Sequence, residues 1–80
     1  MTHIILRLPD VKLATGLSRS TIYLRITQGV FTSPVSLGGR AVGWPAHEVA
    51  ALNAARIAGR PDVEIREMVA KLESDRKAVA

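Results

Sequence analysis

The sequence contains no cysteine, so disulfide frameworks, thiolate metal sites, iron–sulfur clusters and a cysteine nucleophile are all excluded. It also lacks any apolar run near the roughly 18 residues that a membrane span needs, and no charged-then-apolar signal peptide opens it. Aromatic residues are scarce, with one Phe, one Trp and one Tyr. We therefore expect a cytoplasmic protein without a base-stacking surface of the RNA-binding type.

Catalytic and metal-binding motifs are missing as well. No GxSxG, GxxxxGKS/T or GxGxxG pattern occurs, so the sequence does not predict an enzyme or a cofactor. His3 and His47 are far apart and show no paired-ligand spacing, so no metal site is expected. We interpret His47 and Glu48, near a helix start, as surface residues favoured by helix polarity and solvation.

The chain does contain an uneven distribution of charge. Its 80 residues suit one domain, and 48% hydrophobic with 22% charged residues is an ordinary globular composition. Residues 1–60 carry seven basic against two acidic residues, whereas residues 61–80 carry four against five. A basic small domain indicates an anionic partner, with nucleic acid favoured over a membrane surface.

Proline, glycine and serine positions divide the chain into elements. After a short extended start, Pro9 suits the first turn of a helix that Gly16 ends, and Ser18 caps a second helix that stops at Gly29. Gly38-Gly39 between two runs of strand formers favours a short hairpin. The predicted fold is mainly α with a small β-hairpin, having helices near 9–15, 18–28, 46–58 and 63–77 and strands near 35–37 and 41–44.

The last predicted helix differs from the others in its regularly spaced pairs of acidic and basic residues. Asp62 is its expected cap, and three acid-first pairs spaced i,i+4 support it: Asp62–Arg66, Glu67–Lys71 and Glu73–Lys77. We expect residues 1–60 to form a DNA-binding domain and residues 61–80 to form a helix that packs on it or mediates dimerisation. The expected core is made of six residues, namely Val11, Leu17, Ile22, Ile26, Val42 and Trp44.

Two short helices joined at a glycine, with the second capped by serine, are typical of a helix-turn-helix. Such a second helix presents its N-terminal residues to the DNA major groove. Arg19 can read guanine or hold a phosphate, and Arg40 at the hairpin tip can reach a phosphate or the minor groove, as a wing does. The candidate DNA-binding residues are Lys12, Ser18, Arg19, Ser20, Thr21, Tyr23, Arg25 and Arg40.

Several segments closely resemble the AlpA-type regulators of phages and prophages. They are Leu8-Pro9-Asp10-Val11, the run from Thr15 to Tyr23, Gly29, Pro34-Val35, the run from Leu37 to Trp44, and Glu48-Val49. The resemblance covers about residues 5–60. It implies a small winged helix-turn-helix similar to excisionases and to the DNA-binding domain of MerR regulators. It further implies a bacterial or phage-borne regulator of transcription that binds double-stranded DNA.

Some alternatives stay open at this point. Leu24-Arg25 reverses the family's usual order of a basic and then an apolar residue, which places Leu24 outward, either beside a thymine methyl group or, as we favour, as a neutral surface residue. Tyr23 is a phosphate contact or a core-edge residue. The whole protein could instead be an excisionase-like DNA-bending factor. It could also be an interaction module that binds a recombinase or polymerase subunit.

Overall fold

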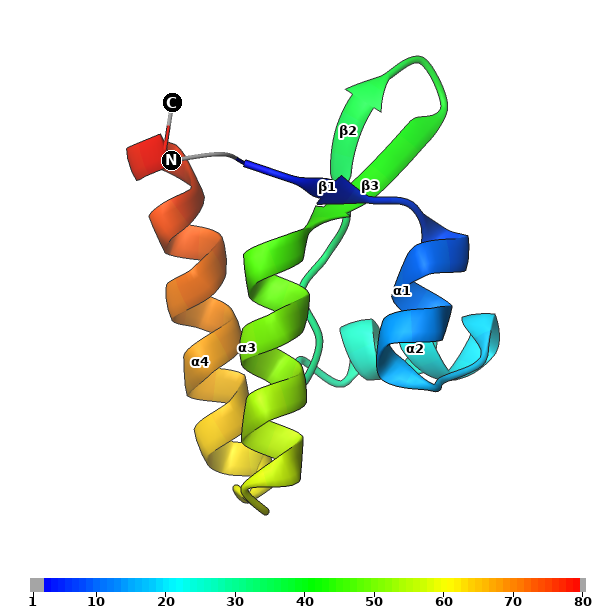
Figure 1. Ribbon diagram of the computed structural model, residues 1–80. Helices are drawn as coiled ribbons and strands as arrows, with labels where there is room; N and C mark the ends of the chain where they lie inside the picture. Colours follow the sequence, from blue (N-terminus) through cyan, green and yellow to red (C-terminus); the bar gives the residue numbers. More distant parts are fainter. Residues whose placement is uncertain (1–2, 80) are drawn as a thin grey trace.

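The computed structural model describes residues 3–79, in which helices dominate and one small sheet projects from them (Figure 1). In chain order the elements are β1 (Ile5–Leu6), α1 (Leu8–Thr15), α2 (Arg19–Thr27), β2 (Val35–Gly38), β3 (Ala41–Pro45), α3 (Ala46–Ile57), α4 (Asp62–Asp75) and the 3-10 helix η1 (Arg76–Val79). This arrangement confirms the predicted fold class and is compatible with a winged helix.

The turn between α1 and α2 forms for local reasons that the sequence displays. Gly16 ends α1 in the left-handed conformation, with φ of 71°, and its N–H donates to the Lys12 carbonyl. Two residues later the Ser18 side chain accepts a hydrogen bond from the Thr21 N–H at 3.2 Å, which caps α2. Both predicted boundaries are therefore confirmed.

The sheet has one strand more than the sequence predicts. Its order is β1-β3-β2, with antiparallel pairing throughout, so β1 covers the edge of β3 opposite the hairpin partner. A Cβ atom at Gly43 would lie 2.5 Å from Ile5 Cγ2 and 2.9 Å from the Leu6 carbonyl oxygen. Glycine at position 43 is thus what lets β1 approach. At its C-terminal end β3 leads into α3 without a loop, because Pro45 is both the last residue of the strand and the N-cap of α3.

Trp44 lies at the centre of the core. Its ring makes edge contacts with Tyr23 and Phe31, at centroid distances of 6.3 and 6.5 Å, and its Nε1 donates to the Thr32 carbonyl at 2.9 Å. Among the predicted core residues, Val11, Ile22 and Trp44 are buried, Leu17 and Ile26 pack against the core, and Val42 is only half-buried. Sequence reasoning did not find the buried pair Val30 and Phe31, which follows α2.

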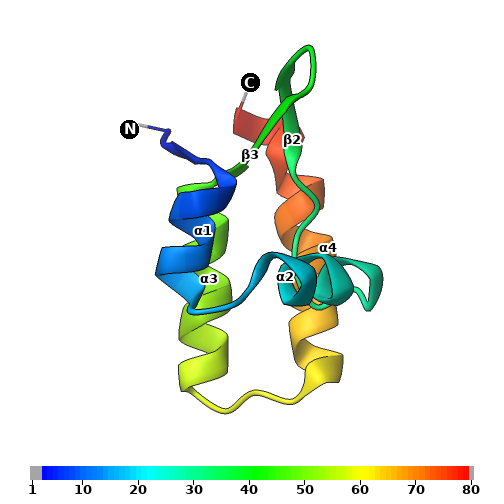
Figure 2. The ribbon, with the colours of Figure 1, turned by 90° about the vertical axis from the view of Figure 1, so that its right-hand side faces the viewer.

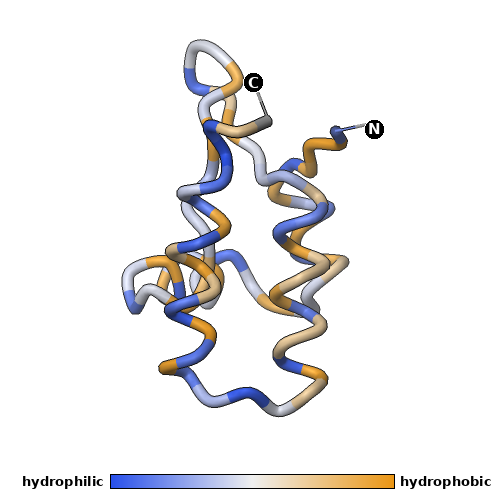
Figure 3. Tube along the Cα trace, turned by 90° about the vertical axis from the view of Figure 1, so that its left-hand side faces the viewer, coloured by the Kyte–Doolittle hydropathy of each residue, from blue (hydrophilic) through white to orange (hydrophobic). Residues whose placement is uncertain are grey.

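The C-terminal helix α4 lies beside α3 (Figures 1 and 2). Hydrophobic positions recur along it between hydrophilic ones (Figure 3), and Ile65 and Val69 are buried in the common core. The expectation that Asp62 caps this helix is wrong: Pro61 is the N-cap, and Asp62 pairs with Arg56 at 3.1 Å.

The three predicted i,i+4 pairs are also wrong within residues 3–79. Arg66 donates through Nε to the Gln28 carbonyl at 3.0 Å, and Lys71 pairs with Asp75 at 3.2 Å. Glu73 accepts from the Ser33 N–H at 2.7 Å. Tertiary acceptors and neighbouring carboxylates compete with helix-face partners, and an exposed i,i+4 pair contributes too little to prevail.

Glu48 is the largest departure from the sequence-based expectation. His47 is exposed as expected, but Glu48 is 0% exposed. Arg76 of η1 donates to both Glu48 carboxylate oxygens, at 2.8 and 2.7 Å, and also to the Ser33 carbonyl. The hydrogen bond to Glu48 raises the pKa of Arg76 above its ordinary value, with burial opposing it. The bidentate pair ties η1 to the first turn of α3, and the bond to Ser33 ties η1 to the segment that precedes β2.

Candidate nucleic-acid interface

The N-terminal turn of α2 is held by two hydroxyl groups. Ser18 Oγ accepts from the Thr21 N–H and donates to Thr21 Oγ1 at 2.9 Å. Ser18 is exposed and Thr21 is half-buried, so this cap fixes the helix start at the surface. A helix start of this kind carries partial positive charge, and α2 has no acidic residue in its first turn to neutralise it.

Arg19, Ser20 and Tyr23 surround a shallow hollow of about 360 Å³ on the outside of α2. The guanidinium carbon of Arg19 lies 5.7 Å from the centroid of the Tyr23 ring, within the range of a cation–π contact. The half-buried Tyr23 ring rests in turn on Trp44. The core therefore supports the Tyr23 ring, and the Tyr23 ring supports the exposed Arg19 side chain.

Arg40 stands at the tip of the β2–β3 hairpin, which we call the wing (residues 35–45). Gly38 and Gly39 turn the chain there with φ of 104° and 55°, conformations that side chains rarely adopt. Viewed from the side that carries α1 and α2, the wing extends beyond the helices (Figure 2). Arg40 is consequently exposed at the far end of a narrow projection.

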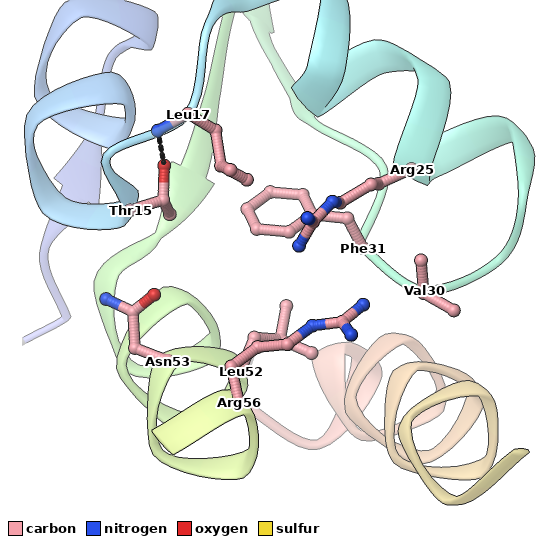
Figure 4. Close-up of a pocket in the computed structure, with 8 residues that line it drawn as sticks. All are labelled: Thr15, Leu17, Arg25, Val30, Phe31, Leu52, Asn53 and Arg56. Atoms are coloured by element: carbon pink, nitrogen blue, oxygen red, sulfur yellow. Dashed lines mark hydrogen bonds between the residues drawn. The ribbon is translucent and has the colours of Figure 1, made fainter. Parts of the chain in front are cut away.

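Arg25 does not join the group around Arg19. It lines a second hollow of about 240 Å³, together with Thr15, Leu17, Val30, Phe31, Leu52, Asn53 and Arg56. In Figure 4 the side chains of Arg25 from α2 and Arg56 from α3 extend toward the same space. No sequence spacing pairs Arg56 with Arg25, because only the fold brings these two side chains to one hollow.

Ion pairs use the basic residues unevenly within the part of the chain that the structure describes. Each of the four ion pairs among residues 3–79 uses a cation from the C-terminal half: Arg56, Arg60, Lys71 or Arg76. Lys12, Arg19, Arg25 and Arg40 take part in none of them. Arg7, Arg66 and Lys77 take part in none either, and Arg66 instead donates to the Gln28 carbonyl. Among residues 3–79, every cation of α1, α2 and the wing is thus free of an ion pair, and an external anion can reach exposed Lys12, Arg19 and Arg40.

Other kinds of site find little support in the described residues. Within residues 3–79 no three His, Cys, Asp or Glu side chains gather in a way that could hold a metal ion. Over the same residues, every helix is too short or too polar to cross a bilayer. The surface around α2 and the wing combines positive charge, hydroxyl groups and a projecting hairpin, a combination suited to contacting a polyanion.

Comparison with known proteins identifies the family. Residues 4–57 match the family described as prophage CP4-57 regulatory protein (AlpA). "Uncharacterized protein ORF88" of Enterobacteria phage P4 is 56% identical over 55 residues, which are 69% of this chain and 62% of that protein, so the chain spans less than two thirds of that relative. No solved structure gives a significant match. The matched segment contains α1, α2, the wing and α3, and the chain belongs to the AlpA family of prophage regulatory proteins.

Proposed function

We propose that this protein is a sequence-specific regulator of transcription that binds double-stranded DNA in a phage, a prophage or another mobile element. The observation that carries the proposal is that every cation of α1, α2 and the wing is free of an ion pair, while the four ion pairs among residues 3–79 all use cations between Arg56 and Arg76. Membership of a family of prophage regulators supports the same conclusion.

In this proposal α2 enters the major groove with its N-terminal turn leading. Arg19 donates two hydrogen bonds to guanine O6 and N7 or holds a phosphate, and Ser20 donates to a base or a phosphate beside it. Ser18 and Thr21 fix the helix start, whose free N–H groups face the backbone. The hydroxyl of Tyr23 reaches a phosphate while its ring stays on Trp44.

The remaining cations contact the backbone on either side of α2. Arg40 at the wing tip binds a phosphate or enters the minor groove. Lys12 and Arg25 neutralise phosphates near α1 and the end of α2. Residues 1–60 supply these contacts, and α4 stabilises them by packing Ile65 and Val69 into the same core. The protein would act in the bacterial cytoplasm, associated with the nucleoid, with no cofactor, as a monomer or a homodimer.

Fluorescence anisotropy tests the proposal. The protein is titrated onto the DNA upstream of its own gene and onto an unrelated duplex, each at low and high salt. If Lys12, Arg19, Arg25 and Arg40 neutralise three or four phosphates, log Kd changes with log salt with a slope of magnitude about 3 to 4. Tighter binding to one duplex that persists at high salt would support a regulator that reads sequence.

Two results would contradict parts of the proposal. Equal, salt-sensitive affinity for every duplex tested, including a randomised pool, would leave an architectural protein of the excisionase type, and circular-permutation gels would then detect the bend. No binding even at low salt would remove DNA as the partner. A protein partner, such as a recombinase or polymerase subunit, would then be the alternative.

A further inference from the structure

Leu24 is an apolar side chain on the outer face of α2. It is 54% exposed, and it follows Ser20 by one helical turn and precedes Thr27 by three residues. Residues at these spacings share one face of a helix, and all three are exposed. We call Ser20, Leu24 and Thr27 the outer strip. Ile22 on the opposite side of α2 is 0% exposed, so the outer strip faces away from the core.

The outer strip carries no charge. The Thr27 hydroxyl already donates to the Tyr23 carbonyl at 3.1 Å, so Thr27 offers an acceptor lone pair and a methyl group rather than a free proton. Arg19, the one cation of the first turn, instead lies against the Tyr23 ring. A phosphate favours charged partners, so a surface of hydroxyl and methyl groups suits base edges better than backbone.

The geometry points to Leu24 as a specificity-determining residue that contacts thymine 5-methyl groups, rather than the neutral surface residue that the sequence alone favours, an inference that rests on the proposed function. The thymine methyl is the apolar group that base pairs display in the major groove. Leu24 lies at the centre of the face presented to that groove, and the core does not use it. Its side chain is apolar like the thymine methyl group and is small enough to contact it. Leu24 would then select A·T pairs beneath the middle of α2, while Arg19 acts at its start.

Removal of single methyl groups tests this contact directly. A binding site is first selected from a randomised duplex pool, and each thymine in it is then replaced in turn by deoxyuridine, which lacks only the methyl. Burial of one methyl-sized group corresponds to about a fourfold change in affinity. We expect the parent protein to lose about that factor at one or two thymines and nothing at the others.

The variant Leu24→Ala completes a double-mutant cycle. It should bind the thymine site about as weakly as the parent binds the deoxyuridine site, and it should not respond to the same replacement. Leu13→Ala is the matched control, because Leu13 is 84% exposed on α1 and lies outside the outer strip. This control should keep the parent's response to deoxyuridine. Circular dichroism melting of both variants checks that they fold like the parent.

Each contrary outcome has a distinct meaning. A parent protein that binds its selected site tightly but ignores every deoxyuridine replacement, or selects a site without thymine, would overturn the role of Leu24 and leave the proposed function intact. Equal loss on both duplexes for Leu24→Ala would show that Leu24 acts elsewhere, for instance against a second copy of the chain. A parent that binds no duplex would overturn both proposals.

Discussion

Single arginines serve opposite purposes in this protein. Arg76 is immobilised by both oxygens of Glu48 and by the Ser33 carbonyl, whereas Arg19 is exposed and rests only on the face of Tyr23. The residues beside them differ, with serines flanking Arg19 and with Asp75 and Lys77 flanking Arg76, but these neighbours do not show which arginine is half-buried. Arg19 could be predicted as a contact residue from the serine cap before it. The partner of Arg76 could not, since it lies 28 residues away.

Substitution of Arg19 tests the candidate interface. Arg19→Ala should weaken binding to the selected duplex by about 1–3 kcal/mol if the guanidinium makes a bidentate base contact. Arg60→Ala is the control, because it removes the same charge from an arginine that already pairs with Glu64. Anisotropy titrations measure both. Equal affinity of Arg19→Ala and the parent would remove Arg19 from the interface.

The buried ion pair predicts an asymmetric response to substitution. Arg76→Met leaves the fully buried Glu48 carboxylate without compensation and should lower the free energy of unfolding by about 3–5 kcal/mol. Glu48→Gln should cost less, about 1–3 kcal/mol, because Arg76 is 22% exposed and can turn toward water. Urea denaturation measures both values. A larger loss for Glu48→Gln than for Arg76→Met would contradict this account.

At the scale of elements, local signals were predicted well and pairings across the fold were not. The cap at Ser18, the glycine stop at Gly16 and the hairpin glycines depend on neighbours within four residues, so the sequence displays them. The third strand β1 depends on contact between residues 5 and 45. No local pattern reveals that contact, and only the requirement for glycine at position 43 hints at it.

Gly43 therefore offers a test of how firmly β1 is attached. Gly43→Ala adds a Cβ against Ile5 and the Leu6 carbonyl, so β1 must move away, at a cost of about 1–3 kcal/mol in unfolding free energy. Gly16→Ala serves as a comparison, since its Cβ would meet nothing within 4 Å and only the left-handed backbone, worth about 1 kcal/mol, opposes it. Hydrogen exchange should show faster exchange at the Ala46 N–H, which donates to Ile4, in the Gly43 variant alone.

For the molecule as a whole, the family match and the folded unit do not coincide. The match ends at residue 57, yet Ile65 and Val69 beyond it are buried with Leu52 and Ala55 of α3. Domains of this size bury little surface in total, so each helix contributes a large share of the stability. The sequence predicted a helix near residues 63–77 that packs on the domain or mediates dimerisation, but not that its C-terminal end contacts Ser33 at the base of the wing.

Shortened chains test this dependence. A chain that ends at Arg60 exposes the α3 face and leaves Glu48 without Arg76, so we expect no cooperative unfolding transition in urea. A chain that ends at Asp75 keeps α4 and lacks only η1, and should unfold cooperatively at a lower urea concentration than the full chain. A chain ending at Arg60 that unfolds like the full protein would show that α4 is dispensable.

The direct passage from β3 into α3 constrains how the chain can change in length. One residue inserted between Pro45 and Ala46 would rotate α3 by about 100° and shift it by about 1.5 Å relative to the wing. Glu48 would then turn away from Arg76, and Val49 and Leu52 would leave the core. An insertion at the wing tip, residues 39–40, would leave the contacts of Glu48, Val49 and Leu52 unchanged. Evolution can therefore lengthen or shorten the wing at its tip, while the junction of Pro45 and Ala46 keeps the angle between the wing and α3 fixed.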